Sequence, residues 1–218
     1  MSNHSNPSTA VKFLQGHFVD MDQQLDASKL GMWAFLATEV LFFGGFFVAY
    51  TVYRIMYPEL FKMGAQHLIT FAGATNTLVL IASSVSVAFA IHFANVNKKR
   101  NIIISLSITL GLAFCFLIIK GYSWISEFGE GIYPGRYYTF EGIAHAKAHI
   151  FFSLYYMMTG LHALHVMIGI GLMIWLLKKA LNHDFDSEYF VPLEVVGLYW
   201  HFVDLIWIFL FPLFYLVS

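Results

Sequence analysis

Apolar residues run along the chain in five long blocks separated by short polar stretches. A helix needs roughly 20 mostly apolar residues to cross the hydrocarbon core of a bilayer, and these blocks reach or exceed about that length. None shows the sustained alternation that membrane β-strands require over about 10 residues. The pattern predicts an all-α integral membrane protein, a five-transmembrane-helix bundle with spans at about 30–53, 69–94, 102–120, 147–177 and 192–217.

The remaining stretches set the domain organisation. Residues 1–29 are polar and contain no apolar h-region, so we expect an N-terminal segment outside the bilayer and no cleaved signal peptide. Residues 30–218 are expected to form a single membrane domain. The stretch of about 121–146 is rich in Trp, Tyr, Gly and Pro, which is typical of an ordered loop at the membrane interface.

The cations give an expected orientation, because short loops rich in Lys and Arg stay in the cytoplasm. With five spans the two termini lie on opposite sides. We therefore expect the N-terminus in the cytoplasm and the C-terminus outside, which in a bacterium is the periplasm. The inner side would carry Lys12, Lys29, Lys98, Lys99, Arg100, Lys178 and Lys179, and the outer side Arg54, Lys62, Lys120, Arg136 and Lys147.

Composition agrees with a membrane location and excludes some functions. Of the 218 residues, 59% are hydrophobic and 11% charged, whereas soluble domains carry about 25% charged residues. A net charge of −1 argues against a nucleic-acid partner. Cys115, the single cysteine, lies in an apolar run and offers neither a disulfide nor a paired metal site.

Ionisable residues inside spans are costly and need a partner or a function. At about 1.5 Å per residue, three helices place such groups at similar depths of about 14–22 Å from the cytoplasmic side. We therefore expect a mutually hydrogen-bonded carboxylate–imidazole cluster near the bilayer midplane. The ionisable residues in the spans are Glu39, Lys147, His149, His162, His165, His201 and Asp204, with His92 near a span end.

The histidines leave three interpretations open. His165 and His201 lie at a similar depth on two helices, so they are candidates for the axial ligands of a b-type haem. A proton or ion path would use the same residue types. A structural polar cluster is the third interpretation and the favoured one. A zinc or non-haem iron site is weaker, because Glu39 is not followed by the Glu-x-x-His spacing of carboxylate-bridged metal sites.

Four segments, taken in order, resemble the signature helices of one family. They are "LGMWAFLATEVLFFGGFFVAY" (30–50), "NTLVLIASSVSVAFA" (76–90), "TGLHALHVMIG" (159–169) and "YWHFVDLIWIFLFPLFYL" (199–216). Together they resemble subunit III of haem-copper terminal oxidases, in the short five-helix bacterial form. The resemblance runs from about residue 28 to 217. It falls on Glu39, Asn76, Thr77, Ser84, His162, His165, His201 and Asp204, and reaches Glu127 through the family's aromatic and acidic loop.

This resemblance implies a chain with no catalytic centre that works as part of an oxidoreductase. Haem and copper would belong to partner subunits I and II, and this chain would hold no cofactor of its own. It would stabilise subunit I and its proton-uptake region and bind phospholipid, in a bacterial cytoplasmic membrane and in some cases in a larger respiratory supercomplex. The listed polar residues would then be structural or lipid-site groups.

Other functions remain as alternatives. The chain could serve a quinol oxidase or a complex related to nitric oxide reductase, although "ATEVLFF" and "DASKLGMW" look closer to the cytochrome c branch. A b-haem membrane cytochrome and a small transporter using Glu39 belong to other classes. The transporter is disfavoured because no interrupted span or inverted repeat is visible.

Overall fold

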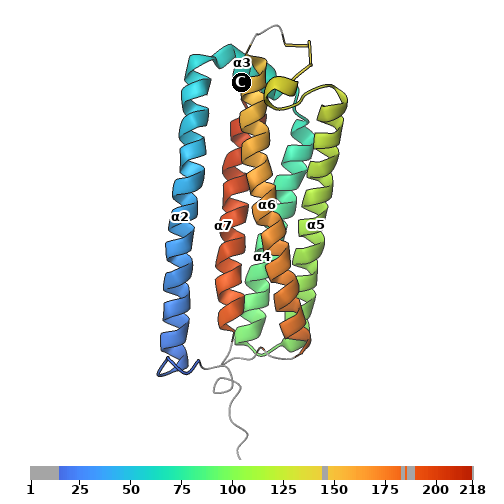
Figure 1. Ribbon diagram of the computed structural model, residues 1–218. Helices are drawn as coiled ribbons and strands as arrows, with labels where there is room; N and C mark the ends of the chain where they lie inside the picture. The colour runs from blue at the N-terminus through green and yellow to red at the C-terminus, as the bar shows by residue number, and fades with distance from the viewer. Residues whose placement is uncertain (1–14, 144–146, 183–184, 186–189, 218) are drawn as a thin grey trace, which may run out of the picture.

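The computed structural model describes residues 15–143, 147–182, 185 and 190–217. Within them, five helices are long and apolar enough to cross a membrane, as expected: α2 (Met21–Met56), α4 (Thr70–Asn95), α5 (Lys99–Gly129), α6 (Ala148–Leu181) and α7 (Val191–Tyr215). They stand side by side along one axis, and the start of α2 and the end of α7 lie at opposite ends of the bundle (Figure 1).

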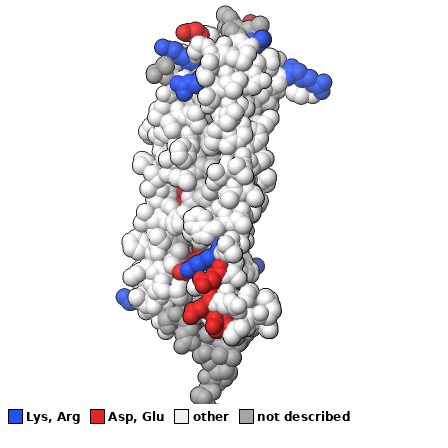
Figure 2. Space-filling view, turned by 90° about the vertical axis from the view of Figure 1, so that its left-hand side faces the viewer, with Lys and Arg blue, Asp and Glu red and all other residues white. Residues whose placement is uncertain are grey.

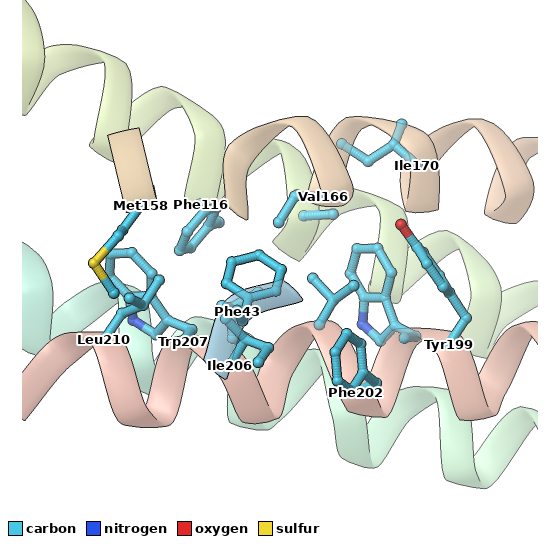
Figure 3. Close-up of a cluster of buried hydrophobic side chains, with 14 of the residues drawn as sticks. Phe43, Phe116, Met158, Val166, Ile170, Tyr199, Phe202, Ile206, Trp207 and Leu210 are labelled. Atoms are coloured by element: carbon cyan, nitrogen blue, oxygen red, sulfur yellow. The ribbon is translucent and has the colours of Figure 1, made fainter. Parts of the chain in front are cut away.

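Helix α4 pairs along its length with α5 and also packs on α7, while α6 packs on both α5 and α7. Helix α2 stands at the edge of the bundle and packs mainly on α7 (Figure 1). Residues of four helices interlock in the buried centre, among them Phe43, Phe116, Val166 and Trp207 (Figure 3). By these contacts α4 to α7 form a compact four-helix unit, and α2 lies against one side of it and inserts Phe43 into the buried centre.

Helix α2 begins earlier than its predicted span. It starts at Met21, where Asp20 provides the N-cap: its side chain accepts a hydrogen bond of 2.8 Å from the Gln23 backbone N–H. Part of the polar segment 1–29 is thus helical, and residues 1–14 lie outside the described part of the chain. An Asp cap satisfies one of the free donors at a helix start, which explains why the helix extends beyond the apolar run.

The prediction of a loop over 121–146 is wrong in its first part, because α5 continues to Gly129. The reason is a polar face that points inward: Lys120, Ser123 and Glu127 are all buried at helical spacing. Beyond Gly129 the chain does leave the helix, and over the described residues 130–143 it forms a single 3-10 turn, η1 (Gly135–Tyr137).

A short helix that the apolar pattern did not reveal follows α2. The helix α3 (Pro58–Gln66) begins at a proline, which is well tolerated in the first turn of a helix and ends the preceding one. It buries Leu60, Phe61 and Gly64, and a Cβ on Gly64 would lie 2.4 Å from the Phe151 ring. Helix α3 thus packs against the start of α6 at the end of the bundle shown uppermost in Figure 1.

On the face shown in Figure 2, most charged side chains lie toward the two ends of the molecule, and a broad belt with little exposed charge separates them. The belt carries many exposed apolar side chains, such as Leu41 and Val48 of α2 and Ile118 of α5. An apolar belt between charged ends is the surface expected of a protein whose middle lies in hydrocarbon.

Candidate functional site

One carboxylate and one imidazole meet in the middle of the bundle. Glu39 lies on α2 and His165 on α6, and the Glu39 Oε2 and His165 Nε2 atoms are 3.1 Å apart. Their side chains are 18% and 13% exposed, so the pair is largely withdrawn from the surface. This contact is the polar link between the edge helix and the four-helix unit at this level.

The ring of His165 is held in one orientation by its other nitrogen. His165 Nδ1 lies 2.8 Å from the Leu161 carbonyl, and a carbonyl only accepts, so Nδ1 carries the proton. A hydrogen bond between Nε2 and Glu39 then needs one further proton, on the carboxyl or on the ring. Phe43 packs edge-on against the imidazole at 5.3 Å between centroids, and Tyr199 donates to the His165 carbonyl. Contacts from α2 and from its own helix thus hold the His165 ring in place.

A second polar contact joins α4 to α7. Ser84 Oγ lies 2.6 Å from His201 Nδ1. Both residues line a groove of about 300 Å³ between the two helices, together with Asp204. Asp204 is 3% exposed, and neither of its carboxyl oxygens makes a hydrogen bond within the part of the chain described.

Two more hydroxyls of α4 accept hydrogen bonds from indoles of α7. Thr77 accepts from Trp207 Nε1 and Ser83 from Trp200 Nε1, each at 3.1 Å. With the Ser84–His201 contact, α4 and α7 are joined by three side-chain hydrogen bonds over about two turns. Polar contacts of this kind between helices stabilise association in lipid, where no hydrophobic effect drives it.

His162 does not share the environment of His165. It is buried between Phe116, 5.6 Å away between ring centroids, and Trp207, 5.2 Å away. Neither of its ring nitrogens has a hydrogen-bond partner among the described residues. Asn76, nearby on α4, donates to the Phe116 carbonyl at 3.4 Å. His162 thus packs as an aromatic ring toward α5 and α7.

The prediction of one mutually hydrogen-bonded cluster is therefore wrong. Glu39 contacts His165, whereas His201 contacts Ser84, and His162 has no hydrogen-bond partner among the described residues. Residues three apart on a helix point about 60° apart around its axis, which is enough to turn them toward different neighbouring helices. These residues therefore lie at a similar depth in the bundle, but they do not all contact one another.

The most extensive polar network lies elsewhere, around Lys120 near the end of α5. Its ammonium is buried and donates to Tyr155 Oη at 2.7 Å and to Tyr215 Oη at 2.9 Å. Tyr155 and Tyr156 in turn donate to the two carboxyl oxygens of Glu127, each at 2.9 Å. Four aromatic rings also lie within 5.6 Å of the ammonium, which favours the cation further.

Sequence reasoning missed this network. It counted Lys120 as a charge on the outer side and reached Glu127 only as part of a loop. Two features of the sequence could have revealed it. Lys120 and Glu127 are seven residues apart, which puts both on one helix face, and α6 carries two adjacent tyrosines. His149, the other candidate at this end, lies in the first turn of α6, where its carbonyl accepts a hydrogen bond from Ser153 at 2.6 Å.

Comparison with known proteins identifies the family. A family model described as "Cytochrome c oxidase subunit III" matches residues 12–218. The chain belongs to the cytochrome c oxidase subunit III family.

Several relatives of subunit III agree with this assignment. Cytochrome c oxidase subunit 3 of Thermostichus vulcanus is 31% identical over 196 residues, which are 88% of this chain and 89% of that protein. The subunits 3 of Gadus morhua and Osphranter robustus are each 32% identical over 203 residues, which are 90% of this chain and 71% of those proteins. The cyanobacterial relative is thus matched over most of its length, whereas the animal relatives extend further.

As a subunit III, the chain is a membrane protein of the respiratory chain that associates with other oxidase subunits. The family carries no metal centre of its own, and the described residues contain no group of three or more metal-ligating side chains. The haem ligands of the alternative reading, His165 and His201, lie against different partners, Glu39 and Ser84. The two candidate haem ligands thus each join their helix to a neighbouring helix.

Proposed function

We propose that this chain is the non-catalytic subunit III of a bacterial cytochrome c oxidase, where it stabilises subunit I and its proton-uptake region and binds phospholipid. The match of the family over residues 12–218 carries the proposal. The cytochrome c branch is favoured over a quinol oxidase, because the relatives named above are all described as cytochrome c oxidase subunits. The complex would reduce oxygen and pump protons in the cytoplasmic membrane.

The shape of the bundle supports a stabilising role. Helix α2 buries few residues against the rest of the chain and exposes apolar side chains on its outer face, among them Leu30, Leu41, Val48 and Ile55. Helix packing in lipid depends on close contact rather than on a hydrophobic effect, so a weakly packed helix gains most from a further helix beside it. Subunit I is our candidate for that neighbour.

A groove between α2 and α7 supports the phospholipid role. It encloses about 760 Å³ and is lined by apolar side chains such as Trp33, Leu36 and Phe202. His201 lines both this groove and a smaller one that holds the ion pair of Lys29 and Glu194, 2.8 Å apart. An apolar groove that leads to a charged end suits an acyl chain and its headgroup.

Gentle detergent extraction tests the proposal. We expect the chain to co-purify with a large haem-bearing subunit, with cytochrome c as electron donor to the purified complex. The isolated chain should show no stoichiometric haem absorption band. A haem band in the isolated chain, or purified chain that transports a solute on its own after reconstitution, would point instead to the cytochrome or transporter alternatives.

A further inference from the structure

The turn between α4 and α5 is a rigid unit that carries three consecutive cations. Asn97 has a φ of 54°, in the left-handed region that asparagine tolerates. The Asn97 N–H donates to the Ala94 carbonyl at 3.0 Å and the Lys98 N–H donates to the Phe93 carbonyl at 2.8 Å. These two bonds form a Schellman motif, which fixes where the chain leaves α4. Lys98, Lys99 and Arg100, the basic turn, are therefore held at a defined place beside Phe93.

The positive charge of the basic turn is not neutralised by its described surroundings. None of its three side chains lies within ion-pair distance of a carboxylate in the described part of the chain. By contrast, Lys29 near the α2–α7 groove is paired with Glu194 at 2.8 Å. Lys98 also caps α5 without a side-chain hydrogen bond, so the first backbone N–H groups of this helix add to the positive potential.

An apolar groove begins at the basic turn. It encloses about 500 Å³ between α4 and α5 and faces outward from the bundle. Asn101, the residue that follows the basic turn, lines its mouth beside Phe93. Deeper in, it is lined by Phe89, Ile104 and Ile108, which are 53%, 47% and 49% exposed. Along α4 the groove runs from residue 93 to residue 82, about 17 Å at the helical rise.

We propose that the α4–α5 groove and the basic turn bind one anionic diacyl phospholipid, with its phosphate at the basic turn and one acyl chain along the groove. The charge at the mouth favours an anionic headgroup, and a basic pocket between membrane helices is a recurring site for anionic lipids. This inference rests on the proposed function, which places the chain in a phospholipid membrane. It adds a second lipid site, lined by α4 and α5 rather than by α2 and α7.

The test uses the intact oxidase complex, delipidated and placed in nanodiscs of phosphatidylcholine with increasing phosphatidylglycerol. Native mass spectrometry counts the phosphatidylglycerol retained per complex. We expect one phosphatidylglycerol to be retained selectively over phosphatidylcholine. The variant Lys99→Gln/Arg100→Gln should weaken that binding about 30-fold, because each cation near the headgroups contributes about 1 kcal/mol. Its control is Lys178→Gln/Lys179→Gln, which removes the same charge from the end of α6 on the same side of the membrane.

A second pair of variants tests the groove. Ala82 lines it, whereas Ala88 is exposed on the same helix and does not. Ala82→Trp fills the deep end and should abolish the selective retention, and Ala88→Trp should leave it unchanged. The mass of the intact complex in the same spectra shows that each variant chain has assembled with the haem-bearing subunit.

Three results would overturn the proposal: equal retention of phosphatidylcholine, an equal loss in the Lys178→Gln/Lys179→Gln control, or no effect of Ala82→Trp. Each would leave the proposed function standing, as long as the chain co-purifies with the haem-bearing subunit. If the chain does not co-purify with the haem-bearing subunit, the proposed function itself is contradicted.

Discussion

The Glu39–His165 pair is a residue-scale contact that joins α2 to α6. Glu39→Ala removes the partner of His165 Nε2 and leaves a largely buried nitrogen unsatisfied, a loss of about 1–3 kcal/mol. We expect the oxidase to lose activity sooner during turnover and to release this chain at a lower temperature, while its haem absorption spectrum stays unchanged. Glu39→Gln keeps a hydrogen-bonding side chain and should be milder. Loss of a haem signal in Glu39→Ala would contradict the assignment of a structural role.

Lys120 and Glu127 give a second residue-scale prediction. The Tyr155 hydroxyl accepts a hydrogen bond from Lys120 and donates one to Glu127. Through this shared hydroxyl each of the two charges stabilises the other. Glu127→Gln leaves a buried ammonium without its counter-charge, which costs about 3–5 kcal/mol in comparable buried pairs. Lys120→Met/Glu127→Gln removes both charges and should restore much of that loss. Thermal denaturation of the four forms in detergent gives the coupling energy, and additive single effects would show that the two residues act independently.

Residue pairing was harder to predict from the sequence than residue depth. Counting along each helix correctly put Glu39, His165 and His201 at a similar level. It could not tell which of them meet, because the direction of a side chain around the helix axis matters only once the neighbouring helices are placed. Lys120 was misassigned because it ends an apolar run, where a lysine usually reaches the membrane surface. Its ammonium is buried against two tyrosines, Tyr155 and Tyr215, that lie far along the chain.

At the scale of elements, the contact between α6 and α7 depends on a glycine. A Cβ on Gly169 would lie 2.5 Å from the Trp200 ring, which is fully buried. Gly169→Ala should therefore push the helices apart and cost about 1–3 kcal/mol through overpacking. Gly171→Ala is the matched control, since a Cβ there meets no atom within 4 Å. The measurement is the fraction of the chain that stays folded after heating in membranes. We expect Gly169→Ala to lower this fraction and Gly171→Ala to leave it unchanged. Equal fractions for the two variants would contradict the packing argument.

The number and order of the membrane helices could be read from the apolar blocks, because five stretches of that length have few other ways to satisfy their backbone in lipid. The element ends could not. The end of α5 holds Trp124, Glu127 and Gly129, whose composition suggests a loop, yet its polar residues face inward on a helix. The short α3 has too few residues to stand out against the apolar blocks on either side of it.

At the scale of the whole molecule, the structure changes the charge balance that orients the chain. Five cations were assigned to the outer side, but Lys120 is buried among aromatic rings, which leaves four against the seven on the other side. The described acidic residues at the inner end, such as Asp22 and Asp26 of α2, do not weaken this asymmetry, because carboxylates contribute little to orientation. The charge asymmetry thus still predicts an N-terminus in the cytoplasm.

Single-cysteine labelling tests that orientation. In a Cys115→Ala background, Lys98→Cys reports on the turn between α4 and α5, and Arg136→Cys on η1 at the other end of the bundle. Both side chains belong to surface turns, so neither change disturbs the core. A membrane-impermeant thiol reagent added to spheroplasts should label position 136 and spare position 98 until the membrane is opened. The reverse labelling pattern would show that the basic turn lies outside the cytoplasm. That result would contradict the positive-inside rule, by which short cationic loops stay in the cytoplasm.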